Sequence, residues 1–94
     1  MIVRWTAGAL ADLISIENYQ RLHWPASRAA FEQRLSAIER RIAEFPFSAP
    51  RVTQRSSVRV VAFPDFLYRL FYSGDSDGIN VLAIRHTSRR SQFE

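Results

Sequence analysis

The sequence predicts an α+β domain in which an antiparallel sheet carries a helical hairpin on one face. Two observations lead to this class. Apolar residues recur with a helical period between about residues 7 and 44, and short β-type runs precede and follow that region. Proline or clusters of small polar residues separate the runs. The predicted order is strand, helix, helix, strand, strand, strand, within one domain spanning residues 1–94.

The N-terminal half predicts one short strand and two helices. Met1 to Trp5 is rich in β-formers, and Thr6 is a suitable N-cap for a helix from Ala7 to about Arg21. Pro25 breaks this helix, and the adjacent Trp24 is expected to anchor the two helices against each other. The apolar stripe of the first helix is wide. One of its sides is marked by Leu10, Leu13, Ile14 and Glu17, and the other by Ala9, Leu13, Ile16 and Tyr19.

The second predicted helix runs from about Ala26 to Glu44 and ends before Pro46. Its apolar residues are spaced four, three, four and three, at Phe31, Leu35, Ile38, Ile42 and Phe45. This spacing is typical of a coiled-coil seam. Because two heptads are short for a free-standing coiled coil, the favoured interpretation is packing within the chain, on the first helix and the sheet.

The C-terminal half predicts three strands joined by hairpins, at Val58–Phe63, Phe66–Tyr72 and Ile79–Arg85. Residues 47–57 are expected to be a connecting loop, 64–65 a tight turn and 73–78 a longer turn. The second of these strands is apolar on both faces, which suggests the middle of the sheet. The first strand must then rejoin the sheet at an edge, and the face opposite the helices is partly open for a site.

Arg69 is the only charge in this central strand, so we expect it to reach a sheet edge or an open groove. If residues 73–78 close a simple hairpin with Tyr72 opposite Ile79, Arg69 lies opposite Leu82. His86 is then on the same face four residues further along, roughly 13 Å away between backbones. A bulge or a different turn would change this register.

The composition limits the chemistry that the chain can perform. Without cysteine it forms neither disulfides nor thiolates, and two histidines are too few for a typical zinc site, so no metal or cofactor is expected. No apolar run reaches membrane-spanning length, which makes the cytoplasm the expected compartment. The net charge is +4 and all 13 basic residues are arginine. Although a GC-rich genome accounts for such usage, the charge also indicates an acidic partner, either nucleic acid or an acidic protein segment.

An ordered set of local patterns resembles the RelE/ParE family of bacterial toxins from type II toxin–antitoxin pairs. The first part contributes Val3-Arg4-Trp5-Thr6, Ala9, Asp12-Leu13 and Ile16. The second helix contributes Ile38 and Ala43-Glu44-Phe45-Pro46, and the strands contribute Val58-Arg59, Tyr68-Arg69-Leu70-Phe71-Tyr72, Ile84, His86 and Arg89-Arg90. The resemblance covers nearly the whole chain. The length of the paired helices and the ending Glu44-Phe45-Pro46 are similar to the ParE-like branch.

The resemblance implies a toxin that is bound and neutralised by an antitoxin encoded beside it. RelE-like members cut mRNA on the ribosome, whereas ParE-like members poison DNA gyrase and lack most nuclease residues. The chain has none of the lysines that RelE-like enzymes use. A second group of nucleases in the family uses a glutamate, an arginine and a histidine. Arg69 matches the position of that arginine, and His86 lies near the position of that histidine. The glutamate would be expected in residues 47–63, which contain none.

We therefore expect a gyrase inhibitor without catalytic residues of its own. Two alternatives stay open. One is a ribosome-dependent mRNA endoribonuclease that uses Arg69 and His86. The other is a non-toxic remnant that binds the antitoxin and co-represses its promoter. In each case the partner is a ParD-like antitoxin in a hetero-oligomer, operator DNA is contacted only through that antitoxin, and no membrane is involved.

Contact with the antitoxin or the target is expected at Arg59, Arg69, Arg85, Arg89, Arg90 and Phe93. Several residues considered for the site also have a plainer interpretation. Arg69 could bond a loop carbonyl or one of Asp65, Asp75 and Asp77. Arg59 could be a solubilising charge on an edge strand, His86 a capped residue at a strand end, and the tail a solvated basic segment.

Overall fold

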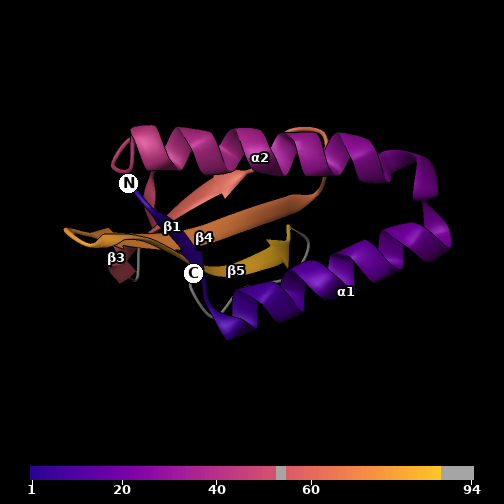
Figure 1. Ribbon diagram of the computed structural model, residues 1–94, viewed down its shortest axis with the longest axis horizontal. Helices are drawn as coiled ribbons and strands as arrows, with labels where there is room; N and C mark the ends of the chain where they lie inside the picture. The colour runs from indigo at the N-terminus through magenta and orange to yellow at the C-terminus, as the bar shows by residue number, and fades with distance from the viewer. Residues whose placement is uncertain (53–54, 88–94) are drawn as a thin grey trace.

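The computed structural model describes residues 1–52 and 55–87, so the predicted site residues Arg89, Arg90 and Phe93 lie outside the described part. The elements are β1 (Val3–Trp5), α1 (Ala7–His23), a 3-10 turn η1 (Pro25–Ser27), α2 (Arg28–Glu44), β2 (Arg51–Val52), β3 (Arg55–Ala62), β4 (Tyr68–Asp75) and β5 (Gly78–His86) (Figure 1). The α+β class and the order of the predicted elements are confirmed. The short strand β2 is additional, because part of the segment predicted to be a loop pairs with β3.

The strands form one sheet in the order β1-β5-β4-β3-β2. β4 is the middle strand, as its apolar residues on both faces predict. β2 to β5 are antiparallel to their neighbours, and β1 joins the edge in parallel with β5, which makes the sheet mixed. A parallel neighbour is possible here because the long segment between β1 and β5 supplies the crossover that parallel pairing requires.

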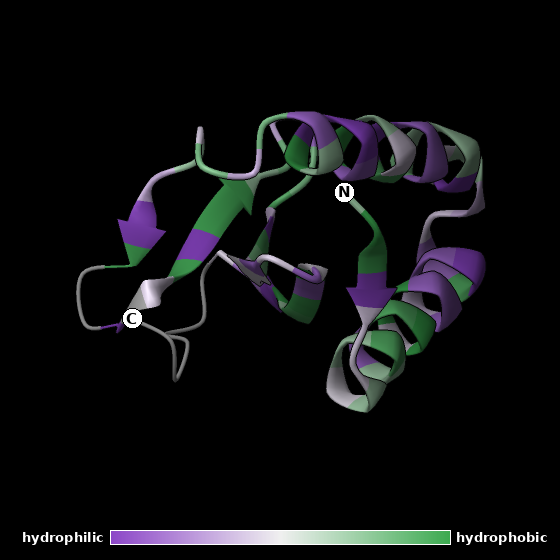
Figure 2. Ribbon diagram, turned by 60° about the vertical axis from the view of Figure 1, so that its left-hand side comes forward, coloured by the Kyte–Doolittle hydropathy of each residue, from purple (hydrophilic) through white to green (hydrophobic). Residues whose placement is uncertain are grey.

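The two helices share a core with one face of the sheet. α2 contributes Phe31, Leu35, Ile38 and Ile42, all buried, so the interpretation as packing within the chain is confirmed. Phe45 instead caps the helix and is 51% exposed. The ring of Phe31 stacks on Phe63 at 5.1 Å, and the rings of Phe66 and Tyr68 approach its edge. Figure 2 shows mixed hydrophilic and hydrophobic bands on both helices, as expected of helices with one buried side.

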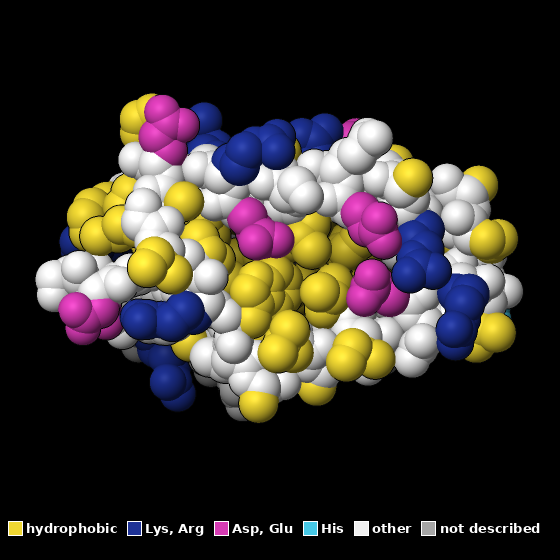
Figure 3. All heavy atoms as spheres, in the orientation of Figure 1, with side chains coloured by type: hydrophobic (Ala, Val, Ile, Leu, Met, Phe, Trp, Pro, Cys, Tyr) yellow, Lys and Arg dark blue, Asp and Glu magenta, His cyan; other side chains and the backbone are white. Residues whose placement is uncertain are grey.

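α1 buries a narrower side than predicted, because Leu10 and Ile14 of the predicted stripe are 46% and 57% exposed. It also departs from the prediction near its C-terminus. Tyr19, placed on the buried stripe by its spacing, is 56% exposed, while the neighbouring Gln20 is only 2% exposed. Trp24 is 58% exposed, so the expectation that it anchors the two helices is wrong. The physical reason is that α1 and α2 diverge from the turn that joins them (Figure 1), and apolar side chains remain visible between them, bordered by acidic ones (Figure 3).

The predicted register of the last hairpin is wrong. The strands continue to Asp75 and from Gly78, so the turn between them contains only two residues, 76 and 77. The Asp75 carboxylate accepts hydrogen bonds from the backbone N–H of Asp77 (2.8 Å) and Gly78 (3.1 Å). Gly78 has a φ of 146°, and a Cβ there would lie 2.6 Å from the carbonyl oxygen of Ile2, so only glycine fits.

A bulge then shifts the pairing of β4 with β5 between Phe71 and Tyr72. As a result Tyr72 lies opposite Val81 instead of Ile79, and Arg69 lies opposite Arg85 instead of Leu82. His86 pairs with Tyr68, in the register position directly beside Arg69. The backbone separation expected between Arg69 and His86 is therefore too large.

Candidate functional site

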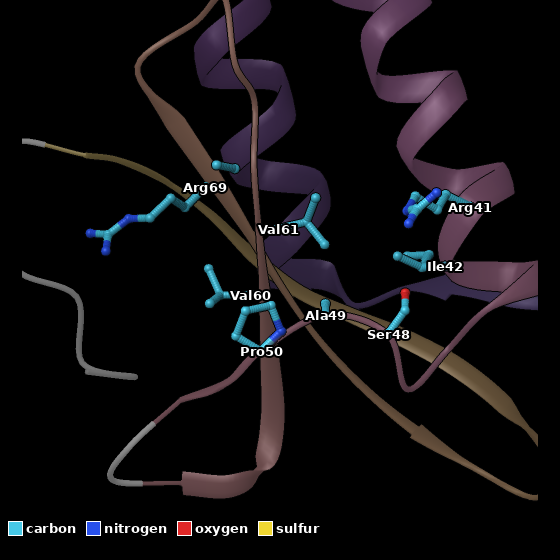
Figure 4. Close-up of a pocket in the computed structure, with 9 residues that line it drawn as sticks. Arg41, Ile42, Ser48, Ala49, Pro50, Val60, Val61 and Arg69 are labelled. Carbon is cyan, nitrogen blue, oxygen red and sulfur yellow. The ribbon is translucent and has the colours of Figure 1, made fainter.

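A cavity of about 450 Å³ opens at the outer edge of β3 (Figure 4). The end of α2, the loop after it, β3 and β4 all contribute to the lining, which consists of Arg41, Ile42, Ser48, Ala49, Pro50, Val60, Val61, Ala62 and Arg69. Figure 4 places Arg69 and Arg41 on opposite sides of the β3 ribbon, with aliphatic side chains between them. We call this hollow the β3-edge cavity. It combines an apolar middle with a cation at either end.

The backbone of β3 is itself exposed to this cavity. β2 pairs with β3 only at Arg59 and Arg55, and the Val60 N–H donates to the carbonyl of Pro50 at 3.0 Å. The Phe63 N–H donates to the Tyr68 carbonyl, so by strand alternation the backbone groups of Ala62 point away from β4. Within residues 1–52 and 55–87 no strand pairs with Ala62 on that side. An extended peptide could add to the sheet here.

Arg69 lies on the sheet face opposite the helices, as expected for a charge that must reach an open groove. Its guanidinium carbon is 5.8 Å from the centre of the Phe71 ring, on the side where Phe71, Val58 and Ala83 form a second, smaller apolar cluster. Two of the carboxylates considered as its partners are engaged elsewhere. Asp65 pairs with Arg34 at 3.0 Å, and Asp75 accepts the hydrogen bonds of the β4–β5 turn.

Arg59 holds one wall of the β3-edge cavity. Its Nη1 donates to the carbonyls of Phe47 (3.1 Å) and Ala49 (2.7 Å), and its guanidinium carbon lies 5.3 Å from the Phe47 ring centre. Because β3 is flanked by β2 at this position, Arg59 is not the edge-strand charge that one interpretation suggested. Its contacts instead position the loop after α2.

Tyr72 supports the same loop from the core side. Its hydroxyl donates to the carbonyl of Pro46 at 2.7 Å, and its side chain is fully buried. Burial raises the pKa of the Tyr72 hydroxyl above its ordinary value of 10.0, and the nearby positive charge of Arg59 opposes this rise. The neutral, donating hydroxyl is therefore the form that the fold favours.

Arg85 is committed to α1. Its Nη1 lies 2.6 Å from Oδ2 of Asp12, and the same oxygen accepts the backbone N–H of Ile84 at 3.0 Å. Although Arg85 and Arg69 are register partners, Arg85 does not line the β3-edge cavity. Of these arginines, Arg69 lines the β3-edge cavity, Arg59 holds the loop beside it, and Arg85 is paired with α1.

His86 lies on the other face of the sheet from Arg69. Its ring meets the edge of Tyr68 at 5.5 Å, and Tyr68 packs against Phe31 in the core beneath the helices. The expectation that Arg69 and His86 share a face is wrong, because the bulge and the two-residue turn change the register. The two residues considered as a nuclease pair are thus separated by the sheet.

Comparisons with known proteins agree with this architecture. A solved structure described as "Chromosomal ParDE TA system from P. aeruginosa" matches with a TM-score of 0.73, covering 92% of this chain and 95% of that chain at 22% identity. At that identity the likeness shows the fold, which is thus one found in toxin–antitoxin systems. A search of curated protein sequences finds no match.

The family follows from the sequence profile described as "ParE toxin of type II toxin-antitoxin system, parDE", which matches residues 3–91. The chain belongs to the ParE toxin family. No group of three or more His, Cys, Asp or Glu side chains in the described ranges is arranged to hold a metal ion. None of the helices in those ranges is long and apolar enough to cross a membrane.

Proposed function

We propose that this protein is a ParE-like toxin that acts by binding and inhibiting DNA gyrase and is neutralised by a ParD-like antitoxin. The main supporting observation is the placement of Arg69 and His86 on opposite faces of the sheet, since a nuclease of this fold would need them at one phosphate. Membership of the ParE family and the lack of lysine point the same way. Both partners act in the cytoplasm, where the proposal places the chain.

The β3-edge cavity supports a specific mode of antitoxin binding. An extended antitoxin segment would pair with the exposed backbone of Ala62 and place apolar side chains over Ile42, Pro50 and Val60. Acidic residues on the segment would meet Arg41 and Arg69 at the two ends, with bidentate contacts that fix the register. Arg89, Arg90 and Phe93 are proposed to add contacts from the tail, and operator DNA would be reached only through the antitoxin.

The decisive experiment is a supercoiling and cleavage assay with purified gyrase, DNA and ATP. The expected result is accumulation of linear DNA when the protein is added, and reversal when its neighbour-encoded antitoxin is added. The RNA-cleaving alternative predicts instead that gyrase is unaffected by protein that is folded and toxic, and that ribosome-bound mRNA is cut. Protein that is harmless to cells lacking the antitoxin would indicate a remnant that only binds its partner.

A further inference from the structure

A second cavity, of about 640 Å³, lies away from the β3-edge cavity and shares no lining residue with it. The C-terminal half of α1, residues 65–68 and the end of β5 enclose it, and we call it the α1 cavity. Its lining consists of Asp12, Ser15, Ile16, Tyr19, Gln20, Trp24, Asp65, Phe66, Leu67, Tyr68, Ile84, Arg85 and His86. The volume is in the usual range for ligand sites, about 300–1,000 Å³.

Gln20 is the unusual residue of this lining. Its side chain is 2% exposed, and its Oε1 has no hydrogen-bond partner. A buried acceptor without a donor destabilises the folded state, so an apolar residue at this position would make the free chain more stable. The position continues the buried side of α1 after Ala9 and Ile16, where an aliphatic residue would serve the fold. An amide is better explained by a hydrogen bond that forms when the cavity is occupied.

The charges around the α1 cavity favour a neutral occupant. Its two carboxylates are already paired, Asp12 with Arg85 and Asp65 with Arg34. The guanidinium of Arg85 is held by Asp12, and the lining contains no other arginine. A phosphate would therefore meet two carboxylates and one engaged cation, which is an unfavourable site for a nucleotide or a nucleic acid.

The shape and surface of the cavity fit a peptide. Beyond Val81 the outer side of β5 has no strand neighbour in the described ranges, and a side chain of α1, that of Asp12, satisfies the N–H of Ile84. The rim carries large apolar groups that are mostly exposed: Tyr19 at 56%, Trp24 at 58% and Leu67 at 66%. Aromatic residues grouped around a pocket are typical of the energetic centre of protein interfaces.

We propose that the α1 cavity binds an uncharged, extended peptide segment of a partner protein. Oε1 of Gln20 is covered in the free chain, so in this proposal the Gln20 amide turns toward the cavity and its oxygen accepts a backbone N–H of that segment. An aromatic or aliphatic side chain of the segment lies among Tyr19, Trp24 and Phe66. This contact is independent of gyrase inhibition and gives the chain a second docking point, on the helix-bearing side of the sheet.

The test is an NMR titration of the ¹⁵N-labelled protein with the neutral peptide N-acetyl-Ala-Phe-Ala-N-methylamide. The expected result is saturable shifts of the Gln20 side-chain amide and of the α1 cavity backbone. Gln20→Met should weaken this binding about tenfold or more, the loss of about 1.4 kcal/mol, and raise the Tm of the free protein by about 4 °C or more, because it removes an unsatisfied acceptor. The matched control is Gln33→Met, the same substitution on the exposed surface of α2.

Several results would overturn the proposal. One is the absence of saturable shifts up to the solubility limit of the peptide. Another is equal binding by Gln20→Met, or by a peptide methylated on every backbone nitrogen, since neither can form the proposed hydrogen bond. A lower Tm for Gln20→Met would assign Gln20 a structural role. Shifts of the same residues by adenosine monophosphate but not by the peptide would assign the cavity to a nucleotide.

Discussion

Two polar side chains of the sheet, Tyr72 and Arg59, hold the loop that follows α2. Between them they donate hydrogen bonds to the carbonyls of residues 46, 47 and 49. This loop has no regular structure from which its carbonyls could take partners, so the sheet supplies the donors. The same loop forms a wall of the β3-edge cavity, so these two residues support the proposed antitoxin site without lining it.

Tyr72 should make the stability of the protein sensitive to alkaline pH. Because burial raises its folded-state pKa above the ordinary value of 10.0, its contribution is complete below about pH 10 and is lost as the pH rises through the folded-state pKa. Tyr72→Phe should lower the free energy of unfolding by about 1 kcal/mol at neutral pH and flatten the decline above pH 10. Urea unfolding across this pH range measures both effects. An unchanged alkaline decline in Tyr72→Phe would contradict the assignment.

Arg59 should act on partner binding through the loop. Arg59→Met removes the donor to two carbonyls and should cost about 1–3 kcal/mol of stability, and it should also weaken antitoxin affinity as the cavity wall loosens. The matched control is Arg40→Met, which removes an exposed arginine from α2. Isothermal titration with the antitoxin and thermal unfolding give the two readouts. Full affinity in a destabilised Arg59→Met variant would show that the wall does not contribute.

At the scale of elements, α1 is fixed to the sheet by polar contacts at its start. Thr6 caps the helix by accepting the Ala9 N–H at 3.2 Å, and its hydroxyl also donates to the Val81 carbonyl at 3.0 Å. One turn later Asp12 accepts the Ile84 N–H, beyond the point where β1 stops pairing. The helix thus takes over from β1 as the neighbour of β5, which covers a sheet edge that would otherwise be open.

Substitutions of Asp12 should separate its two contacts. Asp12→Ala loses both the ion pair with Arg85 and the acceptor for the Ile84 N–H, and should cost about 1.5–3 kcal/mol. Asp12→Asn keeps an acceptor and should cost less than half as much. Urea unfolding gives the free energies, and hydrogen exchange of the Ile84 amide gives the local effect. Equal costs for the two variants would mean that the ion pair, not the backbone hydrogen bond, holds α1.

The sequence predicted the elements better than their pairing. Helical spacing from Phe31 to Ile42 and the N-cap at Thr6 are local signals, and both are confirmed. The bulge at Phe71 and Tyr72 depends on contacts across the sheet, so no local pattern revealed it. β2 is only two residues long and directly follows Pro50, so the sequence there predicts a loop. Hence the expectation that Arg69 reaches an open groove agrees with its place in the β3-edge cavity, whereas its predicted relation to His86 is wrong.

Gln20 is a buried residue of the α1 cavity that helical periodicity did not identify. Helical spacing from Ala9, Leu13 and Ile16 places Tyr19 on the apolar stripe of α1. The available signal was the spacing from Leu13 and Ile16 to Gln20, which places a polar residue on the buried side. A polar residue at such a position indicates either a buried partner or an absent ligand. The packing of the whole chain is needed to decide between them.

At the scale of the whole molecule, the two cavities differ in the charges of their lining residues. The β3-edge cavity has cations at its ends, whereas the α1 cavity has paired charges and a neutral amide. The first is suited to an acidic segment and the second to a neutral one. A partner chain long enough to reach both would gain from the high effective concentration of its second segment.

The tail beyond Thr87 should contribute to partner binding. A chain ending at Thr87 retains every described strand and helix, and should therefore keep its cooperative unfolding transition. Loss of Arg89, Arg90 and Phe93 should weaken antitoxin affinity about tenfold or more, in the range of single charge-pair losses at interfaces. Isothermal titration and a growth assay measure affinity and toxicity. If both are unchanged in a folded, shortened chain, the tail is a solvated segment.

Arg69 provides the sharpest test of the β3-edge cavity, because it is a half-buried charge on the central strand that lines this cavity. Arg69→Gln keeps a polar but shorter and uncharged side chain and should preserve the fold. It should weaken antitoxin binding about tenfold or more, and it should lower the dependence of affinity on salt, because one charge pair is lost. Arg40→Gln, on the exposed side of α2, changes the net charge equally and should leave affinity unchanged.

The growth assay on the same variants then separates antitoxin binding from action on the target. A variant that escapes the antitoxin but still arrests growth would place Arg69 in the antitoxin contact alone. A variant that loses both activities while keeping its Tm would make this cavity a shared surface for antitoxin and target. In that case neutralisation is direct competition, because one segment cannot occupy the β3 edge while the target does. Unchanged affinity and unchanged salt dependence for Arg69→Gln would remove the β3-edge cavity from antitoxin recognition.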